Sequence, residues 1–212
     1  MTTADTFVET PVAPSQKPAR PPSVQPVLEK LFELYPHLFG SKFLPLKLGI
    51  FQELLAAHPQ HFQRDTLKAA LGVHTRSGRY LQCVAARRQR HDLAGAPVED
   101  VAPEHVYLAI LELFRRRQHR SPVDLGPELR GRLVEAIEAS GLSQQDYLAR
   151  IKLHDVQANP ALEEAFAEIR QKLARQEALS KAYLASGKTP EEFADMYGLN
   201  ARDLKAAALG NP

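Results

Sequence analysis

The most informative part of the chain is the stretch LKAALGVHTRSGRYLQCVAARRQRHDL, residues 67–93. Apolar residues recur in and just before it at helical spacing and predict two consecutive helices, at about 64–72 and 76–85. These segments and the residues after them carry a dense set of cations: Lys68, Arg76, Arg79, Arg87, Arg88 and Arg90. Basic side chains contact phosphates, and an aromatic ring among them, here Tyr80, can stack on a base or a ribose. The stretch therefore favours a surface that binds nucleic acid.

The expected start of the second of these helices forms a candidate anion site. Thr75 precedes the helix and Ser77 lies in its first turn. Their hydroxyls, together with the free backbone N–H groups of a helix start, suit a phosphate. A phosphate bound there would also meet Arg76 and Arg79. Thr75 is equally well explained as an ordinary helix N-cap.

The segments on either side complete a small helical domain. A helix is expected at about 27–39, ended or kinked by Pro36, and another at about 46–57. Residues 91–98 are typical of two very short strands joined by a turn that contains glycine. A proline then opens a helix over about 103–118. The expected fold class is mostly α (α+β), with five helices and a short β-hairpin over residues 26–120.

The two ends of the chain differ from this middle part. Residues 1–25 are rich in proline and lack periodicity, so we expect a disordered tail. Residues 122–212 predict an all-α region of unknown role. Its expected helices lie at about 127–139, 144–153, 160–185, 190–197 and 201–208.

Charge is distributed unevenly along the chain. Residues 27–120 hold 14 Lys and Arg against 9 Asp and Glu, whereas residues 121–212 hold 11 against 14. A basic middle segment indicates a polyanionic partner there, although solvated surface charge explains it as well. No apolar run is long enough to span a membrane. The single cysteine, Cys83, fits a reducing compartment, and we expect a cytoplasmic protein.

Signatures of catalysis are missing from the sequence. It has no Gly-rich phosphate loop, no nucleophile elbow and no HExxH motif. His58 and His61 have HxxH spacing, but Pro59 lies between them and no cysteine is near, so surface histidines explain them better than a metal site. We expect no enzyme activity, no metal and no cofactor.

Three sequence blocks resemble the ProQ/FinO family of bacterial RNA chaperones. The first is LPLKLGIFQEL at residues 44–54, similar to a PLKxGIxxxL block, and YPHLF at residues 35–39 fits the end of the family's first helix. The second joins LKAAL at 67–71 to HTRSGRYL at 74–81, and the third is RHDLAG at 90–95. The resemblance covers about 95 residues.

The resemblance implies a compact domain that binds structured small RNAs, in particular intrinsic terminator hairpins with a single-stranded 3′ tail. Such proteins stabilise small RNAs and promote RNA–RNA pairing in post-transcriptional regulation. Lys47, Tyr80 and Arg90 occupy the positions of the family's principal RNA contacts, and Lys68 stands where arginine is common. Thr75, Arg76 and Ser77 match the helix start that holds the RNA 3′ end.

Several of these residues also fit a purely structural role, and the C-terminal region allows two different functions. Lys47 also suits a surface lysine, Tyr80 a core aromatic, and Arg87 and Arg88 solubilising residues of a loop. Residues 189–209 faintly resemble a helix-turn-helix, which would make the chain a DNA-binding regulator, although that segment carries few cations. The C-terminal helices could instead bind a protein partner and make the chain an adaptor that tethers this partner to RNA.

Overall fold

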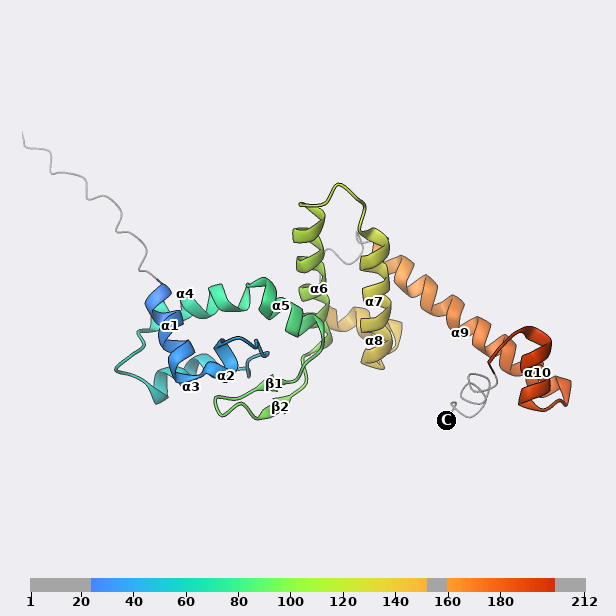
Figure 1. Cartoon of the computed structure of the whole chain (residues 1–212), viewed down its shortest axis with the longest axis horizontal. Coiled ribbons are helices and arrows are strands. Elements are labelled where there is room, and N and C mark those ends of the chain that lie inside the picture. Colours follow the sequence, from blue (N-terminus) through green and yellow to red (C-terminus); the bar gives the residue numbers. More distant parts are fainter. Residues whose placement is uncertain (1–23, 152–159, 201–212) are drawn as a thin grey trace, which may run out of the picture.

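A computed structural model describes residues 24–151 and 160–200 (Figure 1). Within these residues the chain is mainly helical, with one small antiparallel sheet of two strands. The fold class expected from the sequence is therefore confirmed. The expected disordered tail and the helix at about 201–208 lie outside the described residues, apart from residues 24 and 25, where helix α1 begins.

Proline divides the first expected helix into two pieces. Helix α1 spans Gln25–Leu34 and the single turn α2 spans Pro36–Phe39. Tyr35 stands between them with non-helical backbone angles, because the ring of a following proline disfavours the helical conformation at the residue before it. The break lets Leu31 on α1 and Leu38 on α2 both enter the core, where neither is exposed.

The segment before the next helix is extended, which corrects the helix expected at 46–57. Leu46 forms a parallel bridge to His91, and the amide of Lys47 donates to the His91 carbonyl oxygen at 2.9 Å. Helix α3 begins only at Ile50 and spans Ile50–Ala57. Gly49 precedes it at φ +86°, a left-handed angle that a glycine adopts without strain.

Residues 44–47 thus lie beside a β-hairpin. Strand β1 (Arg90–His91) pairs with strand β2 (Pro97–Glu99), as the sequence predicted. Gly95 lies in the turn at φ +81°, where a Cβ atom would come within 2.6 Å of the His37 ring. The hairpin therefore needs glycine at this position both for the turn and for close contact with α2.

Helices α4 and α5 meet at a tight turn, and the structure moves the expected boundary. Helix α4 spans Arg64–Thr75 and is longer than the expected 64–72, while α5 spans Gly78–Ala85. Ser77 is the N-cap of α5, since its hydroxyl accepts a hydrogen bond of 3.2 Å from the amide of Tyr80. Two expectations are therefore wrong: Thr75 ends α4 and is not the N-cap of α5, and Ser77 caps α5 instead of lying in its first turn.

The later helices extend the same hydrophobic core. Helix α6 (Pro103–Gln118) packs against α5 and α7 (Gly126–Ser140), and α8 (Gln144–Ile151) packs against α6. One core of buried side chains runs from Leu31 on α1 to Phe166 on α9. The division at residue 121 stays a prediction, but the core crosses it without a break.

The C-terminal part ends in an arm. Helix α9 spans Pro160–Ser186, and its later half leads away from the body to α10, Pro190–Tyr197 (Figure 1). A small separate core around Phe193 joins α10 to the end of α9. Thr189 and Glu192 cap α10 with a reciprocal capping box. Among the described residues, the structure has no helix that is both long and apolar enough to cross a membrane.

Candidate nucleic-acid interface

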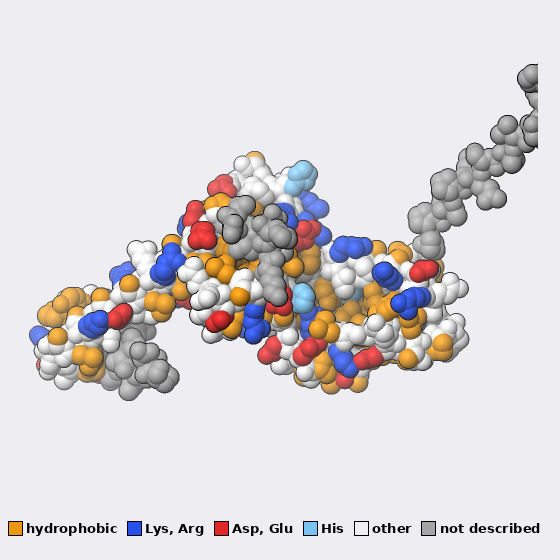
Figure 2. Space-filling model, turned by 180° about the vertical axis from the view of Figure 1, so that it is seen from behind, with side chains coloured by type: hydrophobic (Ala, Val, Ile, Leu, Met, Phe, Trp, Pro, Cys, Tyr) orange, Lys and Arg blue, Asp and Glu red, His pale blue; other side chains and the backbone are white. Residues whose placement is uncertain are grey.

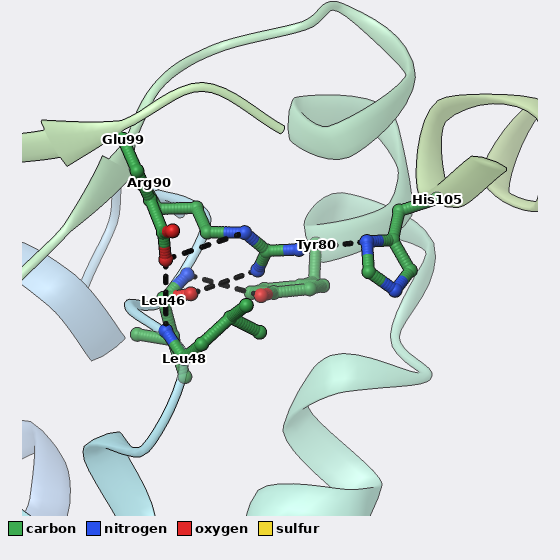
Figure 3. Close-up of polar contacts among 6 residues, drawn as sticks. All are labelled: Leu46, Leu48, Tyr80, Arg90, Glu99 and His105. Carbon is green, nitrogen blue, oxygen red and sulfur yellow. Dashed lines mark hydrogen bonds and ion pairs between the residues drawn. The ribbon is translucent and has the colours of Figure 1, made fainter. Parts of the chain in front are cut away.

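Arg90 lies at the centre of a polar network under the candidate surface (Figure 3). Its Nη1 donates to the Leu46 carbonyl oxygen at 2.9 Å, and its Nη2 lies 3.1 Å from His105 Nδ1. Its Nε is 3.9 Å from Glu99 Oε1, and that carboxylate accepts from the Leu48 amide at 3.2 Å. The residue is only 6% exposed. Arg90 thus ties the extended segment to the hairpin and to α6.

Tyr80 joins the same network from α5. Its hydroxyl accepts a hydrogen bond of 3.0 Å from the Leu46 amide, and the ring is 7% exposed. Burial raises the pKa of this hydroxyl, so it stays protonated at neutral pH. Leu46 therefore has both backbone groups satisfied by side chains from distant segments, its N–H by Tyr80 and its C=O by Arg90.

These positions correct two expectations for the site. Tyr80 and Arg90 were expected to face solvent, and both are buried, because the Leu46 amide and carbonyl groups that they bond lie inside the fold. The alternative of a core aromatic holds for Tyr80. The three sequence blocks nevertheless meet here, since Leu46, Tyr80 and Arg90 each belong to a different one. Both side chains position the residues around them.

Lys47 is the half-exposed residue that this network holds in place. It lies between Leu46 and Leu48, whose backbones are fixed by Arg90 and Glu99. Its Nζ is 2.6 Å from Glu53 Oε1 on α3. The hydrogen bond to Glu53 raises the pKa of Lys47, which keeps the ammonium charged. Lys47 can meet a phosphate only in competition with this carboxylate.

The α4–α5 turn retains part of the expected anion site. The Ser77 hydroxyl and carbonyl already accept from the amides of Tyr80 and Leu81. The Thr75 hydroxyl donates to the Leu71 carbonyl oxygen at 2.8 Å, inside the last turn of α4. What faces an incoming anion is therefore the backbone start of α5, since the first N–H groups of a helix have no partner within it.

The side chain of Arg79, in the first turn of α5, lies beside two stacked aromatic rings. Its guanidinium carbon lies 5.9 Å from the centre of the Phe43 ring, and Phe43 stacks on His74 at 4.7 Å. His74 is buried, and burial lowers the pKa of its imidazole to about 4. The stack is thus uncharged at neutral pH, and Arg79 supplies the positive charge at its edge.

Five of the predicted cations are exposed and carry no ion pair with any residue that the structure describes. They are Lys68, Arg76, Arg79, Arg87 and Arg88. Arg76 and Arg79 flank the start of α5, whereas Arg87 and Arg88 follow its end. An eight-residue helix separates the two groups by about 12 Å. The structure therefore splits the predicted site into two clusters along α5.

Several functional candidates were missed at the sequence level. Glu53 pairs with Lys47, and Glu99 and His105 contact Arg90. The sequence did not indicate these pairs, because the partners are not neighbours in the chain. Arg116 on α6 donates to the Arg76 carbonyl oxygen at 2.7 Å, which brings α6 to the α4–α5 turn. The sequence does show the run Arg115–Arg117 at the end of this helix, where the helix dipole and binding of an anion both explain it.

Metal ligands do not assemble in the described ranges. No group of three His, Cys, Asp or Glu side chains there could hold a metal ion. His58 is instead a partner of Tyr35, whose hydroxyl lies 2.8 Å from its Nε2. The Cys83 thiol donates to the Phe43 carbonyl oxygen at 2.8 Å and lies half-buried.

Comparison with known proteins gives one consistent family. The model of the ProQ/FINO family matches residues 22–124. The RNA chaperone ProQ of Shewanella baltica is 37% identical over 84 residues, and that of Shewanella amazonensis is 36% identical over 84. Each match covers 38% of this chain, and it spans 40% of the first relative and 38% of the second. The expectation that the chain is not an enzyme agrees with these names.

Two solved structures are also similar in sequence to part of this chain. A FinO-like RNA chaperone from Neisseria meningitidis is 31% identical, with a TM-score of 0.37, and the match covers 41% of this chain and 88% of that one. A ProQ homologue from Legionella pneumophila is 27% identical, with a TM-score of 0.40, and the match covers 54% and 99%. Residues 22–124 of this chain are therefore a domain of the ProQ/FINO family.

Proposed function

We propose that the chain is an RNA-binding protein that acts as an RNA chaperone. The observation that carries this proposal is the set of exposed cations along and just after α4 and α5 that form no ion pair with other described residues. The buried Tyr80–Leu46–Arg90 network adds Lys47, which it holds in place beside them. The Shewanella relatives are RNA chaperones, which supports the same function. Because the match spans two fifths or less of those relatives, the activity is proposed here for this domain alone.

The RNA is a structured one, recognised by shape and phosphates. The deep, narrow major groove of A-form RNA hides its base edges, so a basic surface contacts the backbone and the minor groove. Lys68, Arg76 and Arg79 lie on or directly after α4 and on the first turn of α5. A single-stranded 3′ tail would place its last internucleotide phosphate at the start of α5, where backbone N–H groups and Arg79 meet. This favours a terminator hairpin with its tail as substrate.

Binding of this kind would affect gene expression by changing the lifetime and the pairing of RNAs. A protein that covers the 3′ end of a small RNA or an mRNA protects it from degradation, and it brings two RNAs together for pairing. The chain would then act in post-transcriptional regulation, in the cytoplasm, where such transcripts are found.

Two alternatives have less support. The DNA-binding hypothesis depends on residues 201–208 as the second helix of a helix-turn-helix, and this segment lies outside the described residues. The adaptor hypothesis is favoured by apolar side chains at the far end of the α9–α10 arm (Figure 2), where Leu184, Met196 and Tyr197 are more than half exposed. An adaptor role would add to RNA binding and would not replace it.

Fluorescence anisotropy with labelled RNA tests the proposal. The probes are a terminator hairpin with its 3′ tail, the same hairpin with the tail removed, and duplex DNA of the same length. We expect the tailed hairpin to bind most tightly and its affinity to fall steeply with salt, since phosphate contacts release counterions. Equal and weak binding of all three probes would reject the proposal.

A further inference from the structure

A groove runs between α5, α6 and α7, at the junction of the family domain with the C-terminal helices. It consists of two adjoining cavities of about 280 Å³ and 330 Å³, which share Gln82, Leu113, Arg117 and Leu125 in their walls. We call it the α5–α7 groove. Leu129 and Arg132 on α7 line the first cavity, and both lie beyond the residues that match the family.

The walls of this groove combine apolar and basic side chains. Ile110, Leu113 and Phe114 of α6 face Leu125 and Leu129 across it. The ionisable residues of the two cavities are four arginines and one acid: Arg116, Arg117, Arg120, Arg132 and Glu128. The lining therefore carries a formal net charge of +3. An apolar wall beside several cations suits a ligand with a flat ring and negative charges.

Glu128 cannot neutralise all four arginines of the groove, so part of the positive charge stays available to a ligand. Glu128 pairs with Arg117 and lies 3.9 Å from Arg132. Arg116 pairs with Glu112 at 2.8 Å. Arg120 has no ion pair with any residue in the described ranges and is exposed. Arg120 is therefore the cation of the groove that is free to meet a phosphate.

The groove begins at the proposed RNA site. Gly78, the first residue of α5, lines one of its cavities. Arg116 lines the same cavity and bonds the carbonyl oxygen of Arg76 at 2.7 Å. A strand bound at the start of α5 thus has a continuous path past Arg116 and Arg120 toward α7.

We propose that the α5–α7 groove binds single-stranded nucleotides that flank the RNA hairpin, with a base against Leu113, Phe114 and Leu125 and a phosphate at Arg120. The proposal rests on the proposed RNA-binding function. Charge complementarity and continuity with the α5 start select RNA as the occupant. Stacking and apolar contact bind bases of any sequence, so the groove would extend the footprint without reading sequence. The C-terminal helix α7 thereby becomes part of the RNA-binding surface.

Binding measurements with flanks of different length test this inference on the full chain. The variants are Arg120→Ala and the wall variant Leu125→Glu, and Arg175→Ala on α9 is the control, because it removes one exposed cation far from the groove. The probes are one terminator hairpin with a minimal tail and the same hairpin with a long single-stranded flank on its 3′ or its 5′ side. We expect the first two variants to weaken binding of at least one long-flanked probe roughly three- to tenfold and to leave the minimal probe unchanged.

Photo-cross-linking identifies the contact independently of affinity. A 4-thiouridine in the flank should cross-link to the peptide region 110–129 of the wild-type chain. Unchanged affinity of Arg120→Ala for every flanked probe, or cross-links only outside this region, would overturn the groove assignment while the proposed function stands. A wild-type chain that binds no hairpin at all would overturn the proposed function itself. Displacement of the flank by an acidic peptide, without any flank dependence, would identify a protein site in its place.

Discussion

Arg90 donates a hydrogen bond of 2.9 Å from Nη1 to the carbonyl oxygen of Leu46, the residue that precedes Lys47. A cation that the sequence presented as an RNA contact is thus a buried positioning residue for another cation. The same Leu46 is held by Tyr80 through its amide. The surface around Lys47 therefore depends on the integrity of this buried network.

Arg90→Met should lower the free energy of unfolding by about 2 kcal/mol, because it leaves the Leu46 carbonyl and the Glu99 carboxylate without their charged partner. A residue that only contacted RNA would instead affect binding and leave stability unchanged. Urea unfolding followed by circular dichroism measures it. Arg88→Met, which removes an exposed cation two residues earlier, should leave the midpoint nearly unchanged. Equal stability of the two variants would show that the network contributes little.

Tyr80→Phe keeps the ring and removes the hydroxyl that accepts from the Leu46 amide. A buried N–H without a partner costs about 1–3 kcal/mol, so we expect a clear loss of stability with little change in secondary structure. Thermal unfolding provides the measurement. Tyr197→Phe serves as control because that residue is exposed. A Tyr80→Phe protein as stable as the wild type would mean that another group satisfies Leu46.

The helices and hairpin of the domain could be predicted from the sequence, since apolar periodicity and proline positions determine them locally. The start of α3 could not, because Pro45–Lys47 becomes extended only by pairing with His91, which is distant in the chain. The burial of Arg90 was hidden for the same reason. Its partners Leu46, Glu99 and His105 come from three separate segments, so the spacing of residues in the sequence cannot predict these contacts.

Lys68→Ala and Arg79→Ala should each weaken RNA binding roughly three- to tenfold and reduce the salt slope of binding by about one. Their side chains are exposed and form no ion pairs with other described residues, so stability should change little. Anisotropy titrations at several salt concentrations give both quantities. Lys181→Ala removes a cation of α9 and should change neither. A common effect of all three variants would indicate non-specific charge attraction.

Glu53→Gln should strengthen RNA binding, because it frees Lys47 from the carboxylate 2.6 Å away. Lys47→Ala should weaken it, and the double variant should resemble Lys47→Ala. The same titrations measure these affinities at low salt. If Glu53→Gln changed affinity equally with and without Lys47, the effect would be a general loss of negative charge and not the release of this lysine.

Stability should depend on pH through His74. The pKa of its buried imidazole is about 4 against 6.5 for the free side chain, and Nε2 has no hydrogen-bond partner among the described residues. The unfolded chain therefore binds the proton first, so the contribution is complete above pH 6.5 and declines as the pH falls toward 4. The loss at pH 4 is about 3 kcal/mol. His74→Phe should remove this part of the pH dependence in urea unfolding, and an unchanged pH profile would contradict the assignment.

The most direct test of the proposed surface is an NMR titration of the ¹⁵N-labelled chain with a terminator hairpin that carries its 3′ tail. The account predicts that the largest amide shift changes lie at residues 76–82 and around Lys47 and Lys68, and that α9 and α10 stay unchanged. Shift changes confined to α9 and α10, with the α4–α5 turn unaffected, would contradict it.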